Sequence, residues 1–250
     1  MSGGFEGKVA LVTGASSGLG AAVTRKLASE GATVYAVARD RAKLESVADS
    51  ADGPGKVVVD VLDVSDPTAC KAVVAACVDQ LGRLDVLVNN AGRHDFAATP
   101  DVTEEQWFHD LNTNLSGAFF LSQAAIPHLL ESHGNIVNVA SLAGVVGEAY
   151  SAAYTSAKHG LVGLTKALAV EYVRSPLRVN CVCPGGMDTP QVHTIQTPAD
   201  ADWDLIMRIA ALRGFMKPED VANVVAFLAS DDAAAVHGSI QVVDAGHTAG

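Results

Sequence analysis

Tyr154 and Lys158 are the residues whose types and spacing point most directly to chemistry. They lie four positions apart in a run of small and apolar residues, 151–173, that predicts a helix, so their side chains share one face. A phenol has a pKa of about 10 in water, and a nearby ammonium group favours its ionised form. The pair therefore fits a general acid/base, although a lysine that extends along a half-buried ring gives the same spacing.

A glycine-rich turn is the second feature with chemical meaning. It follows an apolar run, 8–13, and precedes an expected helix, 18–30, so its backbone N–H groups can meet a pyrophosphate. The spacing Gly-x-x-x-Gly-x-Gly departs from the common Gly-x-Gly-x-x-Gly fingerprint, and a glycine-rich turn without a ligand is the plain alternative. The expected cofactor contacts in this turn are Gly14, Ser16, Ser17, Gly18, Leu19 and Gly20.

The end of the second expected strand, 33–38, bears on the choice between NADP(H) and NAD(H). In a dinucleotide-binding fold this position meets the adenosine ribose, where a carboxylate suits a free hydroxyl and a guanidinium suits a 2′-phosphate. Arg39 occupies it and Asp40 follows. We therefore expect NADP(H), with NAD(H) as the alternative if Asp40 turns inward. Asp63, after the third strand, fits either an acceptor for the adenine amino group or a helix cap.

Short β-branched runs alternate with longer helical patterns along the chain, which predicts an α/β fold. The expected strands are 8–13, 33–38, 56–62, 85–88, 135–140, 177–183 and 240–243. The expected helices are 18–30, 41–49, 67–81, 104–132, 151–173 and 218–228. Because strand–helix–strand crossovers are right-handed, this order predicts a seven-stranded parallel sheet with helices on both faces, a doubly wound Rossmann-type domain.

The 250 residues contain no internal linker, so a single domain, 1–250, is expected. Within it, residues 187–215 combine prolines, acidic residues and scattered apolar residues, which predicts a mobile substrate lid.

The net charge of −11 argues against nucleic acid or an anionic membrane as a partner. No signal-like or membrane-spanning stretch is visible, so we expect a cytoplasmic protein. The four cysteines lack metal-ligand spacing; no metal is expected, and they are interpreted as buried thiols.

Taken together, these features resemble the short-chain dehydrogenase/reductase family over essentially the whole chain. The motifs follow in the family's order: residues 13–20 at the cofactor turn, Asn-Asn-Ala-Gly at 89–92, Asn114, Ser141, Tyr154 with Lys158, and Pro184-Gly185. Two positions depart from the family's pattern. Ala140 replaces a serine before Ser141, and Ala245 replaces a glycine of Val-Asp-Gly-Gly near the end. We expect these departures to cause only small local shifts.

The resemblance implies an enzyme that transfers a hydride between NADP(H) and a carbonyl or secondary alcohol. It gives Tyr154 the proton transfer, Ser141 the orientation of the substrate oxygen, and Lys158 the nicotinamide ribose and a lowered phenol pKa. It places Asn114 in a proton relay to Lys158, whereas an amide that satisfies a helix kink is the local alternative. The remaining expected cofactor contacts are Val64, Asn90, Ala91, Gly92, Pro184, Gly185 and Thr189, beside Tyr154 and Lys158.

The substrate pocket is expected to be mostly apolar, which favours a hydrophobic or cyclic carbonyl over a sugar. Its expected residues are His94, Val145, Glu148 and His193, with Phe96, Trp203, Ile206 and Met207. The two histidines and Glu148 also fit solvent-exposed loop positions.

Three alternatives to this function stay open. A 3-oxoacyl carrier-protein reductase would need basic residues at the pocket mouth, and the sequence shows no such cluster. An NAD(H)-dependent alcohol dehydrogenase and a non-catalytic cofactor-sensing or scaffold protein are the others; the last would tolerate loss of Tyr154 or Lys158, and both are present. Relatives commonly form tetramers, and the helices 104–132 and 151–173 carry more apolar residues than one buried face needs, so a homotetramer is expected.

Overall fold

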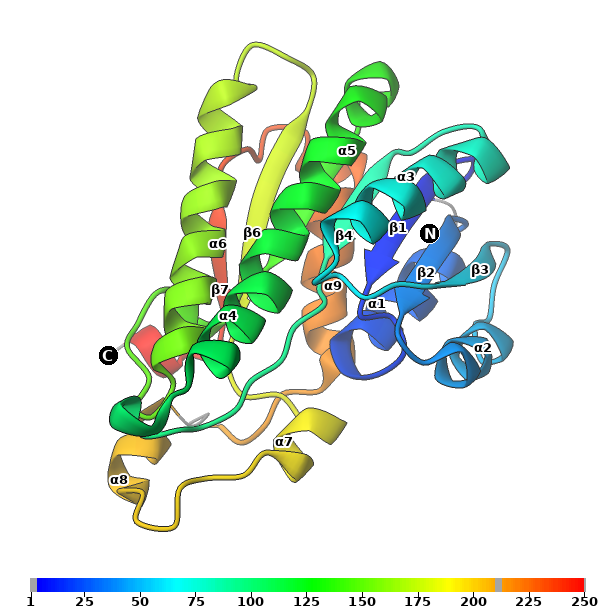
Figure 1. Cartoon of the computed structure of the whole chain (residues 1–250). Helices are drawn as coiled ribbons and strands as arrows, with labels where there is room; N and C mark the ends of the chain where they lie inside the picture. Colours follow the sequence, from blue (N-terminus) through cyan, green and yellow to red (C-terminus); the bar gives the residue numbers. More distant parts are fainter. Residues whose placement is uncertain (1–3, 210–212, 250) are drawn as a thin grey trace.

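The protein is described by a computed structural model over residues 4–209 and 213–249. Its centre is a seven-stranded parallel sheet with the order β3-β2-β1-β4-β5-β6-β7 (Figure 1). The strands are β1 Val9–Thr13, β2 Thr33–Ala38, β3 Lys56–Val61, β4 Val86–Asn89, β5 Asn135–Val139, β6 Arg178–Pro184 and β7 Ile240–Val243. These bounds agree with the predicted strands to within one residue at each end. The predicted fold class is confirmed.

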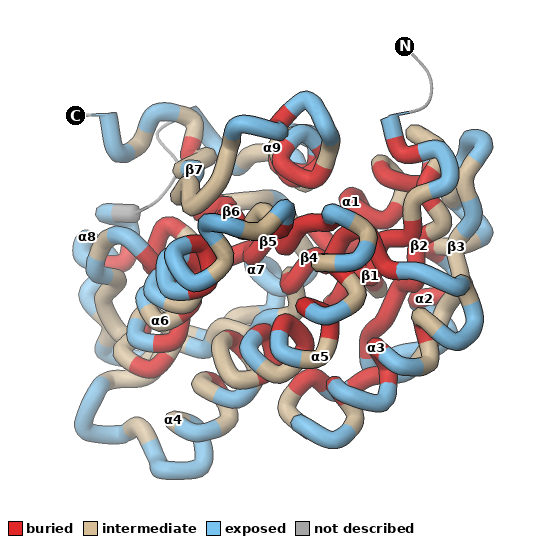
Figure 2. The backbone as a smooth tube through the Cα atoms, turned by 90° about the horizontal axis from the view of Figure 1, so that it is seen from above, coloured by how far each residue is buried: buried red, intermediate tan, exposed pale blue. Residues whose placement is uncertain are grey.

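Helices cover both faces of the sheet, so the strands lie buried between two layers (Figure 2). One layer contains α1 Gly18–Ser29, α2 Arg41–Asp49 and α9 Pro218–Ala229, which all contribute buried residues to one hydrophobic cluster. The other contains α3 Pro67–Leu81, α4 Glu104–Leu111, α5 Gly117–Ser132 and α6 Ala152–Glu171. Short helices α7 Pro190–Thr194 and α8 Trp203–Ile206 lie beyond the carboxyl ends of the strands (Figure 1).

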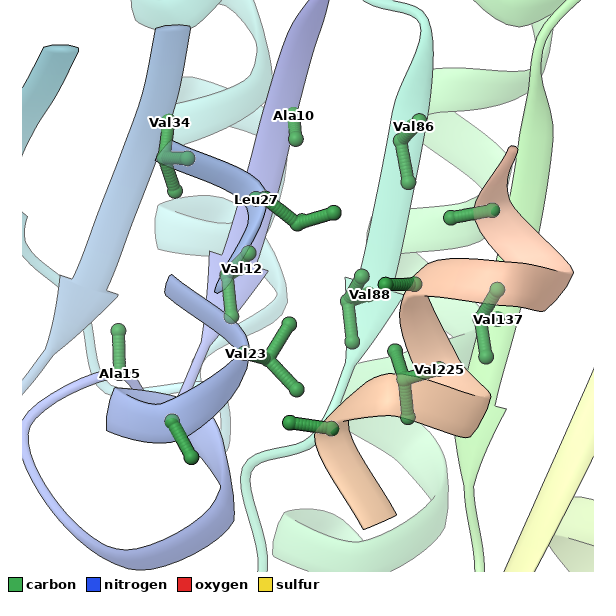
Figure 3. Packing of buried hydrophobic residues seen from close by; sticks show 14 of the residues in the cluster. Ala10, Val12, Ala15, Val23, Leu27, Val34, Val86, Val88, Val137 and Val225 are labelled. Carbon is green, nitrogen blue, oxygen red and sulfur yellow. The ribbon is translucent and has the colours of Figure 1, made fainter. Parts of the chain in front are cut away.

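Small aliphatic side chains make up the core on each face of the sheet. Between the sheet and α1 with α9, Val12, Val88 and Val137 pack against Val23 and Val225 (Figure 3). All five side chains are buried, and each buried valine of this kind contributes roughly 1.5–3 kcal/mol of hydrophobic free energy. The alternation of valine and alanine lets the helices approach the strands closely, which fixes the positions of the strand ends.

The prediction of one continuous helix over 104–132 is wrong. A π-helical turn, Asn112–Ser116, separates α4 from α5. Such a turn inserts an extra residue into the helical hydrogen-bond ladder and leaves a backbone carbonyl free for another donor. The apolar periodicity continues through the interruption, and for this reason the sequence pattern did not reveal it.

Two further expectations concern cysteine and membrane-spanning segments. Cys70, Cys77, Cys181 and Cys183 are free buried thiols, as predicted. Among the described residues, no helix is long and apolar enough to cross a membrane.

Ala245 has a φ of 55°, in the left-handed region where the family's glycine carries no strain, so this departure has a local backbone cost.

Candidate active site

A cleft of about 1290 Å³ lies at the carboxyl edge of the sheet. It is lined at one end by the glycine turn after β1 and at the other by α8. The strand order reverses between β1 and β4, and ligands of open α/β sheets bind outside the strands at such a point. The cleft is therefore at the position where the fold places a dinucleotide.

The glycine turn has the geometry of a phosphate cradle. Gly14 and Gly18 have φ values of 63° and 53°, which favour glycine. A Cβ atom at Gly20 would overlap the carbonyl oxygen of Gly14 and approach Asn90 Nδ2 to 2.5 Å. Ser17, at the start of α1, makes no side-chain cap bond among the described residues, so the first amides of α1 are available to an anion. The residues present here fit a pyrophosphate.

Asn90 and Thr13 hold this turn against the loop after β4. Asn90 Nδ2 donates to Thr13 O at 2.9 Å, and Thr13 Oγ1 accepts from the backbone N–H of Asn90 and of Ala91, both at 2.9 Å. The role of the Thr13 hydroxyl was not predicted. Its signal was a polar residue at the end of an otherwise apolar, fully buried strand.

At the adenosine end of the cleft, positive side chains surround the end of β2. Arg39, Arg41 and Lys43 all line the cleft. Asp40 Oδ1 accepts from the backbone N–H of Lys43 at 3.1 Å and caps α2. This bond lowers the pKa of Asp40 and engages the carboxylate locally. Asp40 also lines the cleft, so its carboxylate combines the helix cap with a position at the adenosine end, and the NAD(H) alternative stays open.

Asp63 lines the same end of the cleft, together with Val64. Its Oδ1 accepts from the Ser65 backbone N–H at 2.9 Å and from the Ser65 hydroxyl at 2.7 Å, and these bonds lower the Asp63 pKa. The cap of α3 is Asp66. The helix-cap alternative for Asp63 is therefore wrong, and its carboxylate lies in the cleft within an Asx turn.

Tyr154, Lys158 and Ser141 converge in the part of the cleft away from the adenosine end, and all three line it. Lys158 lies one turn after Tyr154 on α6, with its Nζ 5.6 Å from the centre of the phenol ring. The Lys158 ammonium donates to Val139 O at the end of β5 at 3.0 Å. Ser141 follows β5, so the strand end and the helix together bring the three residues to one place.

The phenol pKa differs from the prediction. Burial raises the pKa of Tyr154 well above its usual range, while the hydrogen bond with Ser141 acts in the opposite direction and the charges of Glu148 and Asp110 raise it further. Burial also lowers the pKa of Lys158 to about 8. The resemblance gave Lys158 the role of lowering the phenol pKa with the help of the positively charged ring of the oxidised cofactor. In the protein by itself, desolvation of the Tyr154 ring outweighs the nearby ammonium, so the phenol pKa is raised.

Asn114 lies in the π-helical turn, one layer behind the cleft. Its Nδ2 donates to Asp110 O at 3.1 Å and to Arg93 O at 3.0 Å, and its Oδ1 accepts from the Arg93 N–H at 3.1 Å. The first bond satisfies the helix interruption, as in the local alternative considered above. A Cβ on Gly92 would lie 2.9 Å from Asn114 Oδ1 and 3.4 Å from Lys158 Nζ, so both side chains approach the space that this glycine leaves open.

All of the predicted cofactor contacts line the cleft, including Tyr154 and Lys158. Gly14, Ser16, Ser17, Gly18, Leu19, Gly20, Arg39, Asp63, Val64, Asn90, Ala91, Gly92, Pro184, Gly185 and Thr189 line it. Thr189 reaches the glycine turn, since a Cβ on Gly18 would be 3.3 Å from its methyl carbon. This contact joins the segment after β6 to the turn after β1.

The substrate end matches the sequence less well. His94 and Glu148 line the cleft, as do the apolar residues Phe96, Trp203, Ile206 and Met207 that were expected to face the substrate. Val145 and His193 are not among the residues that line it, and His193 instead contacts Asp188 at 2.7 Å on the surface. Phe215 lines the cleft and was not singled out.

His94 and Glu148 form a buried polar cluster beside Tyr154. The imidazole stacks on the phenol ring with centroids 4.1 Å apart. Its Nε2 shares a hydrogen bond with Ser151 Oγ at 2.7 Å and lies 3.7 Å from Glu148 Oε2. Burial lowers the pKa of His94 to about 4 and raises the pKa of Glu148 to about 7. The imidazole is therefore neutral near pH 7 and gives Glu148 no counter-charge.

The sequence of the chain is similar to those of known proteins. The family model described as enoyl-(acyl carrier protein) reductase matches residues 14–248. A 3-oxoacyl-(acyl-carrier-protein) reductase of Thermotoga maritima is 42% identical over 97% of this chain and 98% of its own length. A meso-2,3-butanediol dehydrogenase of Serratia marcescens is 37% identical over 98% of this chain and 96% of its own length.

Solved structures give the same result. The crystal structure of levodione reductase superposes with a TM-score of 0.88 at 33% identity and covers 98% of this chain and 99% of that chain. Both the sequence and the structural matches span nearly the whole chain. The chain therefore belongs to the short-chain dehydrogenase/reductase family and is an NAD(P)-dependent oxidoreductase that acts on hydroxyl or carbonyl groups.

Proposed function

We propose that the protein catalyses reversible hydride transfer between NADP(H) and a carbonyl or secondary alcohol, with Tyr154 as the general acid/base. The observation that carries the proposal is the convergence of Tyr154, Ser141 and Lys158 at the end of a cleft that begins at a phosphate cradle. When bound, the nicotinamide cofactor supplies or accepts the hydride.

Each residue has a separate task in this mechanism. Ser141 and Tyr154 bind the substrate oxygen, and the phenol gives its proton to that oxygen during reduction. Because burial raises the phenol pKa, Tyr154 is held protonated and ready to donate in this direction. The reverse reaction needs the phenolate, whose charge is favoured by Lys158. Asn114 holds the loop at Arg93 by two hydrogen bonds to its backbone, next to the glycine that Lys158 also approaches.

Replacement of Tyr154 by phenylalanine tests the catalytic assignment. Tyr154→Phe keeps the ring that stacks on His94 and removes only the hydroxyl. We expect kcat to fall by roughly 100- to 10,000-fold while the Kd for NADPH, measured by fluorescence titration, changes little. Retained turnover would contradict the assignment.

The preference for NADP(H) is supported by the charges around the end of β2. Arg39, Arg41 and Lys43 line the cleft there and outnumber Asp40, which also lines it and caps α2. Comparison of kcat/KM for NADPH and NADH tests the preference. Arg39→Ala is expected to reduce the ratio by about 10- to 100-fold, since a charge-assisted bond to the phosphate is lost. A native preference for NADH would overturn it.

We also propose that residues 187–215 act as a substrate lid. The two ends of the segment lie together, because Asp188 N donates to Met216 O at 2.9 Å and Met216 N to Gly186 O at 3.0 Å. Between them, α7 and α8 place Ile206 and Met207 in the wall of the cleft. Residues 210–212 of the lid lie outside the described residues. Limited proteolysis within 187–215 should slow when cofactor and substrate are both present, and unchanged cleavage would count against a lid.

A homotetramer is proposed from the exposed apolar residues on the helices that were expected to meet partners. Phe108 on α4, Phe119 on α5 and Val170 on α6 are exposed. Equilibrium sedimentation measures the assembly, and a monomer at micromolar concentration would exclude it.

A 3-oxoacyl carrier-protein reductase remains the second candidate, because the relative from Thermotoga maritima has that name. The two candidates differ in substrate size and charge. A panel of 3-oxoacyl thioesters and small ketones, read by NADPH and NADH absorbance, separates them.

A further inference from the structure

Glu148 is a buried carboxyl group that no described residue binds by a hydrogen bond. Its side chain is 7% exposed, yet it lines the cleft. Among the described residues it makes no hydrogen bond, since the 3.7 Å separation from His94 Nε2 is too long for one. Leaving such a group unpaired in a low-dielectric site costs free energy unless a ligand satisfies it or it takes up a proton.

None of the described residues around Glu148 supplies a hydrogen bond to its carboxyl group. His94 is committed to Ser151 Oγ at 2.7 Å and is neutral near pH 7. The nearest buried cation on α6, Lys158, donates to Val139 O at 3.0 Å. Asp110, the other carboxylate that acts on Tyr154, faces Arg93, whose Nε is 3.6 Å away. The open direction for the Glu148 carboxyl is the cleft.

The imidazole of His94 joins Glu148 to Tyr154. It stacks on the Tyr154 ring, and its Nε2 lies 2.7 Å from Ser151 Oγ and 3.7 Å from Glu148 Oε2. The carboxyl is therefore close enough to Tyr154 for its charge to raise the phenol pKa. Tyr154 and Glu148 thus flank one imidazole ring, and both line the cleft that a substrate would enter.

We propose that Glu148, backed by His94, is a subsite for a hydroxyl group on the carbon next to the reacting carbon, so that vicinal hydroxyketones and diols are the preferred substrates. The subsite rests on the proposed function and determines its specificity. A hydroxyl fits better than an ammonium, because Lys158 already places one positive charge in this pocket. The rest of the substrate meets the apolar side chains of Phe96, Ile206 and Met207.

A matched pair of substrates tests the subsite. Cyclohexanone and 2-hydroxycyclohexanone differ by one hydroxyl, and kcat/KM for each is measured with both NADPH and NADH. We expect native protein to favour the hydroxyketone by about 10- to 100-fold, the range for a hydrogen bond to a charged group. In Glu148→Leu, the ratio of the two kcat/KM values should fall to the intrinsic reactivity ratio of the two ketones. Glu148→Gln keeps an accepting oxygen, so its ratio should lie between those of the native protein and Glu148→Leu.

Glu45→Leu is the control, since this exposed residue on α2 does not line the cleft and makes the same chemical change. It should keep the native ratio. A native ratio that Glu148→Leu leaves unaltered, or a native protein that does not favour the hydroxyketone, overturns the subsite while the proposed function stands.

If no ketone is turned over, that result counts against the proposed function and not against the subsite. A binding measurement then tests the subsite separately. Calorimetry with trans-cyclohexane-1,2-diol and with cyclohexanol, in the presence of cofactor, needs no reaction. Tighter binding of the diol that Glu148→Leu abolishes supports the subsite. Equal binding of the two compounds, or binding of neither, overturns it.

Discussion

The two ends of the cleft are built from different kinds of groups. At the cofactor end, backbone amides and the tight glycine turn between β1 and α1 form the site, and Asn90 and Thr13 hold it. At the substrate end, side chains from separate segments meet: His94 after β4, Glu148 after β5, and Tyr154 on α6. The backbone-built end tolerates little change in shape, whereas the side-chain end contains the buried titratable groups.

This difference also explains what the sequence could predict. Local signals in the sequence located the cofactor end. The spacing of the glycines identified the turn at 14–20, and the residue that follows the second strand identified the guanidinium of Arg39. The strands could be predicted for a similar reason, because buried parallel strands are short, nearly continuous β-branched runs.

The substrate end depends on long-range contacts that no local pattern contains. Residues 94 and 148 are 54 positions apart, and only the folded loops bring His94 to Glu148. The pKa of Tyr154 depends on how completely the site is desolvated, which the spacing to Lys158 does not determine. The π-helical turn at Asn114 and the position of Val145 outside the cleft were likewise decided by tertiary packing.

The largest expected effect on stability and cofactor affinity comes from adding one carbon at the cofactor end of the cleft. In Gly20→Ala the new Cβ meets Gly14 O and Asn90 Nδ2, and the Gly14 atom is backbone that cannot rotate away. We expect a loss of about 3 kcal/mol or more in unfolding free energy and a rise of at least roughly 100-fold in the Kd for NADPH. Urea denaturation and fluorescence titration measure the two quantities.

Gly163→Ala is the matched control for this change. Gly163 is an exposed residue within α6, and a Cβ there meets nothing within 4 Å. Alanine is the better helix former, so a gain of about 0.5–1 kcal/mol is expected. If both substitutions behaved alike, the glycine turn would not be the rigid element described here.

At the substrate end, the buried carboxyl predicts a pH-dependent stability. The pKa of Glu148 rises from 4.5 to about 7 on folding, so the folded protein keeps a proton that the unfolded chain releases between these values. This contribution is complete below pH 4.5 and is lost as pH rises through about 7, by up to roughly 3 kcal/mol. Glu148→Gln cannot ionise. Relative to native protein, it should therefore gain stability between pH 5 and pH 8.5.

Urea denaturation of both proteins at the two pH values measures this difference. His94 has a lowered pKa and titrates in the acid range, but it is present in both proteins and cancels in the comparison. A stability difference between native protein and Glu148→Gln that does not vary with pH would show that the carboxyl is hydrated rather than buried.

Asn114→Ala should have an intermediate effect. The alanine leaves Asp110 O and the backbone of Arg93 without the amide that now satisfies them, which costs about 1–3 kcal/mol. Because the loop at 92–94 approaches Lys158, kcat should fall as well. Asn114→Asp, which keeps the oxygen but not the donor, separates the two roles: stability and kcat should fall together if the amide acts only by holding the loop. A kcat loss with unchanged unfolding free energy would indicate a direct part in proton transfer.

The smallest expected effect lies where the lid meets the substrate end. Tyr150 has a φ of 58°, an uncommon value for a bulky residue, and its hydroxyl accepts from the Asp202 N–H at the start of α8 at 2.8 Å. Tyr150→Phe removes this bond but keeps the ring and the backbone. Since one neutral hydrogen bond contributes about 1 kcal/mol, KM for the ketone should rise by roughly 3- to 5-fold while the Kd for NADPH does not change. An equal loss in cofactor affinity would mean that α8 is coupled to the glycine turn, and the two ends of the cleft would then not be independent.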